Sequence, residues 1–201
     1  MPAKRKHQHN ASGRAGRAVE NAWKALPHKH RELLYEVGAS QWTVRYEPLG
    51  APVHKLLCSA GLSGLSEHER DGLEPALAVW IPALRVVAFN ANHPALTGLS
   101  DSAYERLIAR TAWHEWGHAL SIVRCTPEDV AAGTRLLGLA PTGVSNSIRA
   151  SGYRRYEYTH ELVAQIYSLL IARHKQEESE RPPWLNHELY DLVKRVTAWT
   201  G

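Results

Sequence analysis

The sequence has 201 residues, of which 44% are hydrophobic and 22% are charged, and its formal net charge is +4. This composition excludes a mostly disordered chain and leaves enough residues for one well-filled hydrophobic core. No apolar run approaches the roughly 20 residues that cross a bilayer, the first residues lack the apolar stretch of a secretory signal, and two cysteines are too few for a disulfide framework. We therefore expect a soluble, cytoplasmic protein with no membrane partner.

The positive charge is concentrated near the N-terminus. The first 24 positions contain six Lys and Arg residues and only one acidic residue, Glu20. Residues 1–17 are predicted to form a disordered basic tail, and residues 18–201 a single domain. Such a tail could bind nucleic acid through its phosphate groups. No known nucleic-acid-binding module accompanies it, so a solvated arm is the favoured interpretation.

The segments before residue 100 mix helices and strands. VENAWKAL and PHKHRELLYEVG predict two short helices, the second beginning at Pro27 and ending at Gly38. The segment SQWTVRYEP alternates between polar and apolar residues, which predicts a strand. The continuous apolar run Val86 to Phe89 predicts another strand. Between them, PVHKLLCSAGL could be a strand or a short helix, whereas SGLSEHERDGLEP is typical of a loop.

From Ser100 onward the chain is predicted to be helical. The segment TPEDVAAGTRLLGLA carries a capping box, with Thr126 as the cap and Asp129 three residues later. GVSNSIRAS predicts a short helical piece, and THELVAQIYSLLIARHKQ and LNHELYDLVKRVTAW predict two longer helices. The segment before residue 126 is also predicted to be a helix, because its residues recur at helical spacing. Those on the predicted inward side are Leu107, Ile108, Thr111, Ala112, Ala119 and Ile122, together with the polar residues His114, Glu115 and His118.

The segment TAWHEWGHALS, residues 111–121, therefore places polar residues on the inward side of a helix. His114 and His118 stand one turn apart on the same face, so both imidazoles can bind one ion, for which Zn²⁺ is well suited. Glu115 lies at the flank of the pair and is predicted to act as a general base toward water at the ion. Gly117 costs about 1 kcal/mol relative to alanine inside a helix, which predicts that another backbone or a substrate approaches there.

A catalytic zinc site needs a third protein ligand and one open position. Arg124 stands six residues after His118, which excludes a third histidine at the spacing of the metzincins. Cys125 shares the helix face, but it lies about 10 Å from His118 along a straight helix axis, too far to bind the same ion. A neighbouring helix must supply the third ligand.

Glu161 is the favoured third ligand. It shares one small and polar helix face with Ala164, Gln165 and Ser168, and the small side chain of Ala164 would permit close approach to the motif helix. His160, the preceding residue, is the alternative. A first-turn acid is also favourable at any helix N-terminus, so Glu161 could have a purely local role.

HEWGHALS followed by ELVAQIYSLL resembles the small gluzincin metallopeptidases of the ImmA/IrrE type, in which a His-Glu-x-x-His helix precedes a helix carrying Glu-x-x-Ala, an aromatic residue and leucines. The resemblance covers roughly residues 86–172, and 42 residues separate His118 from Glu161, a longer insertion than we expect for the smallest members. It implies zinc ligation by His114, His118 and Glu161, proton transfer by Glu115, and matches to the second motif at Ala164 and Tyr167. The predicted fold is α+β, with a small twisted sheet packed against a mainly helical, zincin-like domain.

The predicted function is zinc-dependent hydrolysis of peptide bonds in an intracellular protein, and the resemblance implies a regulator such as a repressor. An extended peptide substrate could pair with the predicted strand at residues 86–89. A second donor to the oxyanion is usual in this chemistry. The candidates for that donor are Tyr153, Tyr156, Tyr158 and His160.

There are two alternatives, of which only the first belongs to a different functional class. The first is a catalytically inactive, metal-stabilised binding protein, associated with nucleic acid through its basic tail, in which a fourth ligand such as Cys58, His93 or His160 closes the site. The second is a SprT-like, DNA-associated protease, which is less favoured because no paired-cysteine zinc ribbon follows the motif. The sequence predicts neither the cleavage preference nor the oligomeric state.

Overall fold

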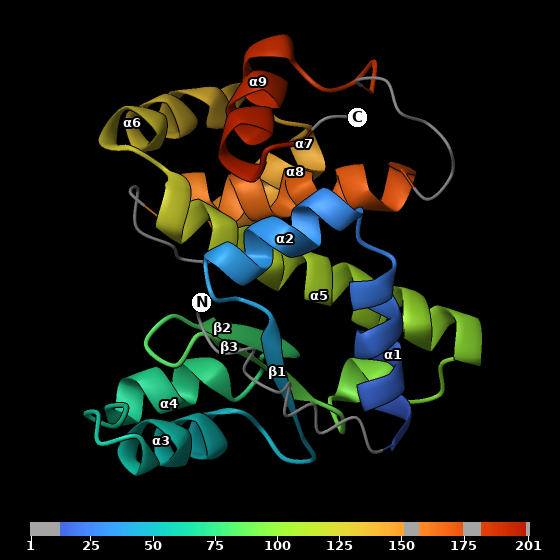
Figure 1. The fold of residues 1–201 in the computed structure, drawn as a ribbon, viewed down its shortest axis with the longest axis vertical. Coiled ribbons are helices and arrows are strands. Elements are labelled where there is room, and N and C mark those ends of the chain that lie inside the picture. Colours follow the sequence, from blue (N-terminus) through green and yellow to red (C-terminus); the bar gives the residue numbers. More distant parts are fainter. Residues whose placement is uncertain (1–12, 151–156, 175–181, 200–201) are drawn as a thin grey trace, which may run out of the picture. The chain divides into compact units, whose positions relative to one another are not determined.

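The computed structural model describes residues 13–150, 157–174 and 182–199 (Figure 1). The chain divides into two compact units: unit 1 contains residues 1–24 and 38–112, and unit 2 contains residues 25–37 and 113–201. The predicted α+β class is confirmed, since a small mixed sheet accompanies many helices. The expectation of a single domain over residues 18–201 stays a prediction.

Unit 1 is built around a three-stranded sheet of order β1-β3-β2. Strand β1 (Gln41–Arg45) pairs in parallel with β3 (Val86–Asn90), and β2 (Ala78–Ile81) pairs with β3 in antiparallel orientation. The other elements of unit 1 are α1 (Gly13–Lys24), α3 (Gly50–Ser59), α4 (Glu67–Leu73), the 3-10 helix η1 (Pro94–Leu96) and the first half of α5 (Asp101–Arg124).

Helices pack on both faces of the sheet, which explains the continuous apolar sequence of its central strand β3. On one face, Leu49, Val53 and Leu57 from the α3 region form a buried cluster with Ile81 and Ala88. On the other face, α1 contacts β1, where the Trp23 and Trp42 ring centroids lie 5.8 Å apart. The hydrophobic core of unit 1 is therefore split between two layers, with the sheet between them.

The strands predicted around residues 41–45 and 86–89 are confirmed, but β3 is the central strand. The prediction that a peptide pairs with an edge of β3 is wrong, because β1 and β2 already occupy its two edges. Strand β2 was not predicted, and its short segment is followed at once by Pro82. Proline within an apolar run argues against a strand, yet here it lies just beyond the strand end.

Two other expectations in unit 1 need correction. SGLSEHERDGLEP contains a helix, α4, and not only a loop: Ser66 Oγ accepts a hydrogen bond from the Glu69 amide, and the Ser66 amide donates to the Glu69 carboxylate. This reciprocal cap stabilises a helix that buries none of its own side chains. Residues 13–17, predicted as part of the disordered tail, are helical in α1, and residues 1–12 lie outside the described residues.

Unit 2 is helical throughout its described elements. They are α2 (His28–Glu36), the second half of α5, α6 (Pro127–Leu136), the 3-10 helix η2 (Leu137–Leu139), α7 (Thr142–Ala150), α8 (Tyr158–His174) and α9 (His187–Thr197). Helix α8 contacts α6, α7 and α9 and is buried on most sides, as its nearly continuous apolar sequence predicts. The helices predicted at α2, α6, α7, α8 and α9, including the Thr126–Asp129 capping box, are confirmed.

The last turn of α5 departs from the predicted pattern. Ile122 was expected on the packed side, but it is 44% exposed, and Val123 and Arg124 are exposed as well. Successive residues of a helix point about 100° apart, so these three neighbours leave roughly half of the turn uncovered, whereas Ser121 on the other side is buried. Within the described residues, no helix is both long enough and apolar enough to span a bilayer.

Candidate metal centre

Three side chains from α5 and α8 converge within unit 2. The Nε2 atoms of His114 and His118 lie 3.0 Å apart. Glu161 Oε1 lies 3.5 Å from His114 Nε2, and Glu161 Oε2 lies 3.1 Å from His118 Nε2. We call these residues the His-His-Glu group. Their potential ligand atoms all lie within 4.8 Å of one another, so the group could hold a metal ion.

The two helices approach closely because Gly117 has no side chain. A Cβ atom built on Gly117 would lie 2.7 Å from the Ala164 Cα and 3.2 Å from Tyr167 Cδ1. Gly117 belongs to the turn between the two histidines, and Ala164 follows Glu161 by one turn. The contact therefore brings the carboxylate of α8 to the imidazoles of α5. The close backbone approach predicted from Gly117 is confirmed.

We expect the substitution Gly117→Ala to separate the two helices. The obstacle to the new methyl group is a backbone atom of α8, which cannot rotate away, and overpacking of this kind costs about 1–3 kcal/mol. The free energy of unfolding and the affinity for zinc should both fall, as measured by urea denaturation and by competition with a chromogenic chelator.

Gly143→Ala is the matched control for this substitution. Gly143 also lies in a helix of unit 2, and its built Cβ meets no atom within 4 Å. Since alanine is the better helix former, this variant should be as stable as the wild type or more so. Wild-type stability and zinc affinity in Gly117→Ala would contradict the close packing of α5 on α8.

The electrostatics of the His-His-Glu group favour a bound cation. Burial opposes the ionisation of Glu161, but the neighbouring His114 and His118 imidazoles outweigh it and hold the pKa of this carboxyl well below its usual range. Burial also opposes a charge on His114, yet its contact with Glu161 and the nearby charges of Glu115 and Glu161 raise the pKa of this imidazole. Either a proton or a metal ion must balance the buried carboxylate.

One oxygen atom of the His-His-Glu group, Glu161 Oε2, lacks a hydrogen-bond donor among the described residues. Glu161 Oε2 is buried, and no donor in the described part of the chain meets it with hydrogen-bond geometry, although His118 Nε2 is near. Glu161 Oε1 accepts a hydrogen bond of 3.0 Å from the Gln165 amide, which fixes the orientation of the carboxylate. A buried oxygen without a donor costs free energy, and a cation at this point would remove that cost.

Glu115 and His160 lie outside the His-His-Glu group. Glu115 is only 8% exposed and close enough for its charge to act on His114. His160, the alternative third ligand, instead shares a hydrogen bond of 2.6 Å between its Nδ1 and Ser121 Oγ. Of the two residues that the sequence offered as third ligand, Glu161 is therefore the one that the structure brings to the histidines.

The other candidate donors are not brought into this group. Both ring nitrogens of His93 are engaged, because Nδ1 accepts from the Ala95 amide and Nε2 contacts the Pro75 carbonyl in unit 1. Cys58, also in unit 1, lies 3.7 Å from His54 Nε2. Cys125 contacts Ser121 Oγ through its sulfur atom. Tyr158 begins α8, whereas Tyr153 and Tyr156 lie outside the described residues.

No model of a known protein family matches this chain, and no curated protein and no solved structure matches it either. The resemblance to the ImmA/IrrE type therefore stays a prediction from the two motifs.

Two contacts of the site were not predicted. Gln165 orients Glu161, and Ser121 orients His160. The first pair could have been found from the sequence, because residues four apart on a helix are neighbours. The second joins residues 39 positions apart and depends on how α5 and α8 pack, which the sequence pattern does not specify.

Proposed function

We propose that this protein is a zinc-dependent peptidase that hydrolyses peptide bonds of an intracellular protein, and that its helical unit 2 is zincin-like. The observation that carries the proposal is the arrangement of four residues. His114, His118 and Glu161 form one buried group of potential ligands, while Glu115 lies beside this group without belonging to it. Separate groups for metal binding and for proton transfer are what metal-assisted hydrolysis requires.

The donor set fits zinc. Two imidazole nitrogens and one carboxylate oxygen are ligands that Zn²⁺ binds in catalytic sites, where a fourth position stays open. The low pKa of Glu161 keeps the carboxylate ionised at neutral pH, and the buried Oε2 atom would gain a partner. A structural zinc site normally has four protein ligands. Within the described residues the group supplies three, which favours the catalytic interpretation.

When bound, zinc lowers the pKa of water and polarises a carbonyl group. The protein residues supply the remaining functions. The Glu115 carboxylate accepts a proton from the attacking water and returns it to the leaving amine nitrogen as the peptide bond breaks. Gln165 holds the Glu161 carboxylate in place, and the buried helix pair excludes bulk water from one side of the group.

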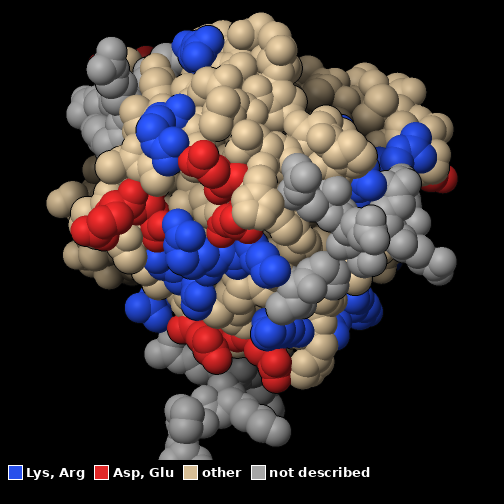
Figure 2. Space-filling view, turned by 90° about the horizontal axis from the view of Figure 1, so that it is seen from above, with Lys and Arg blue, Asp and Glu red and all other residues tan. Residues whose placement is uncertain are grey.

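The nucleic-acid alternative relies on the basic N-terminal tail, of which residues 1–12 lie outside the described residues, and helices α6 and α9 add no support for it. Figure 2 shows a face of the molecule on which Lys and Arg side chains lie among Asp and Glu side chains. Among the described residues of α6 and α9, Arg135 pairs with Glu188 and Arg195 pairs with Asp129. Nucleic-acid binding usually requires a surface with clustered, unneutralised positive charge. The paired arginines of these helices do not provide one.

The proposal is tested by measuring metal content and hydrolysis together. We expect the purified chain to hold about one equivalent of zinc. Incubation with a proteome-derived peptide library in H₂¹⁸O should produce new C-termini that carry ¹⁸O, detected by mass spectrometry. Treatment with 1,10-phenanthroline should abolish these products, and added zinc should restore them. A zinc-loaded chain that yields no ¹⁸O-labelled products would overturn the peptidase proposal.

A further inference from the structure

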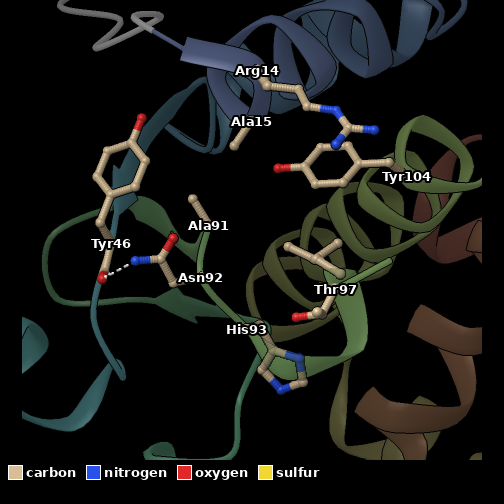
Figure 3. A pocket seen from close by; sticks show the side chains of 9 residues that line it. Arg14, Ala15, Tyr46, Ala91, Asn92, His93, Thr97 and Tyr104 are labelled. Carbon is tan, nitrogen blue, oxygen red and sulfur yellow. Dashed lines mark hydrogen bonds between the residues drawn. The ribbon is translucent and has the colours of Figure 1, made fainter. Parts of the chain in front are cut away.

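We infer that unit 1 binds a small organic anion in a pocket of about 430 Å³ (Figure 3). This strand-end pocket contains no residue of the His-His-Glu group, and the inference does not rest on the proposed peptidase function. Its lining residues are Arg14, Ala15, Tyr46, Ala91, Asn92, His93, Leu96, Thr97 and Tyr104.

The pocket lies where two parallel strands end. β1 and β3 are parallel, and their last residues, Arg45 and Asn90, are partners in the register. The lining residues Tyr46 and Ala91 directly follow them, and the Ala91 amide donates a hydrogen bond of 2.7 Å to the Arg45 carbonyl. The carboxyl ends of parallel strands are the usual position of ligands in open sheets, because the chain diverges there.

The side chain of Asn92 connects the two segments that leave the strands. Its Nδ2 donates a hydrogen bond of 2.6 Å to the Tyr46 carbonyl (Figure 3). The Tyr46 hydroxyl lies against the start of α1, since a Cβ on Gly13 would be 2.6 Å from that oxygen. The pocket wall is therefore formed by contacts between chain segments that are distant in the sequence.

Positive charge is concentrated on the α1 side of the pocket. Arg14 lies in the first turn of α1, and its guanidinium carbon lies 3.9 Å from the centroid of the Tyr104 ring. The first amides of a helix carry partial positive charge and have no acceptors within the helix. Arg14 also pairs with Asp101 at 2.6 Å, but the Asp101 side chain is 94% exposed, so this pair is weak and exchangeable.

The Tyr104 hydroxyl is the second, independent observation that indicates a ligand. Tyr104 is only 5% exposed, and within the described residues its hydroxyl forms no hydrogen bond. Figure 3 shows this hydroxyl directed from α5 toward the hollow beside Ala15. Burial raises the pKa of Tyr104, so the group remains a protonated donor at neutral pH. An anionic oxygen would accept from it.

The lining residues define the class of ligand. Arg14, the start of α1 and the Tyr104 hydroxyl favour a carboxylate or phosphate oxygen, while Ala15, Ala91 and Leu96 offer contacts for a short carbon skeleton. The volume lies within the range of about 300–1,000 Å³ that is typical of small-molecule sites. A molecule the size of an amino acid with one anionic group meets these requirements.

The test uses the full chain and three probes: N-acetyl-L-alanine, its neutral amide, and inorganic phosphate. Titrations followed by ¹H–¹⁵N NMR should show binding of N-acetyl-L-alanine at concentrations below about 10 mM, with the neutral amide at least about tenfold weaker. Comparison with phosphate shows which anionic group is preferred. Failure of both anions to bind at this concentration would refute the inference.

The variant Tyr104→Phe separates a binding role from a structural one. It keeps the ring under Arg14 and removes only the hydroxyl without a partner, so the urea midpoint should equal or exceed that of the wild type. Binding of the preferred anion should weaken by about tenfold, as it should in Arg14→Gln. Arg110→Gln, which changes an exposed arginine of α5, is the control and should bind normally. Wild-type affinity in Tyr104→Phe, or equal binding of the neutral amide, would overturn the inference.

Discussion

The variant Glu115→Gln should retain about one equivalent of zinc and lose hydrolytic activity by about 10²- to 10⁴-fold. The carboxamide has nearly the same shape as the carboxylate, so the packing of this residue, which is 8% exposed, should be preserved. It cannot accept a proton from water at neutral pH. The release of ¹⁸O-labelled peptides measures the activity, and inductively coupled plasma mass spectrometry measures the zinc.

Glu105→Gln is the matched control for this prediction. Glu105 lies on the same helix, α5, and it is exposed. Its substitution should change neither activity nor zinc content. Wild-type activity in Glu115→Gln would exclude Glu115 as the general base. Loss of zinc from Glu115→Gln would instead assign Glu115 to the metal site itself, which the composition of the His-His-Glu group does not predict.

The second large effect is expected in Glu161→Ala, whose affinity for zinc should fall by at least about 100-fold. The substitution removes the only carboxylate of the His-His-Glu group and with it the charge that favours a cation beside the imidazoles. Competition with a chromogenic chelator gives the dissociation constant. Circular dichroism of the metal-free variant shows whether the helices are still formed, so that a folding defect is not mistaken for loss of a ligand.

Two neighbouring variants make this experiment specific. Gln165→Ala removes the donor that orients Glu161 and should weaken zinc binding by about 10-fold, less than loss of the ligand itself. His160→Ala removes a residue bonded to Ser121 and should retain zinc. Full zinc retention in Glu161→Ala would show that Glu161 is not a ligand, and loss of zinc in His160→Ala would favour the alternative.

Much of the site could be predicted because its signals are local. The spacing of His114 and His118 within one helix fixes their common face, and Gly117 marks the point of close approach. The prediction of Glu161 as a ligand required one more step, which was to choose a helix with a small residue, Ala164, one turn after the glutamate. The contact between Gly117 and Ala164 gives the physical reason why that choice agrees with the structure.

The features that were missed depend on long-range contacts or on weak local signals. Strand β2 has four residues and gains its stability by pairing with β3 and packing Ile81 against α3. Helix α4 lacks a buried face, so hydrophobic periodicity could not reveal it, although Ser66 and Glu69 carry the capping-box pattern. The division between the two units falls after Ala112, within the uninterrupted helix α5, where no composition change marks it.

The contact at Gly117 also limits how this protein can evolve. Because the nearest obstacle is the Ala164 Cα, a backbone atom present in every amino acid, trimming Ala164 to glycine would not create room for a side chain at position 117. A compensating second mutation at the facing residue is therefore ruled out, and position 117 is confined to one amino acid for as long as this helix pair keeps its spacing.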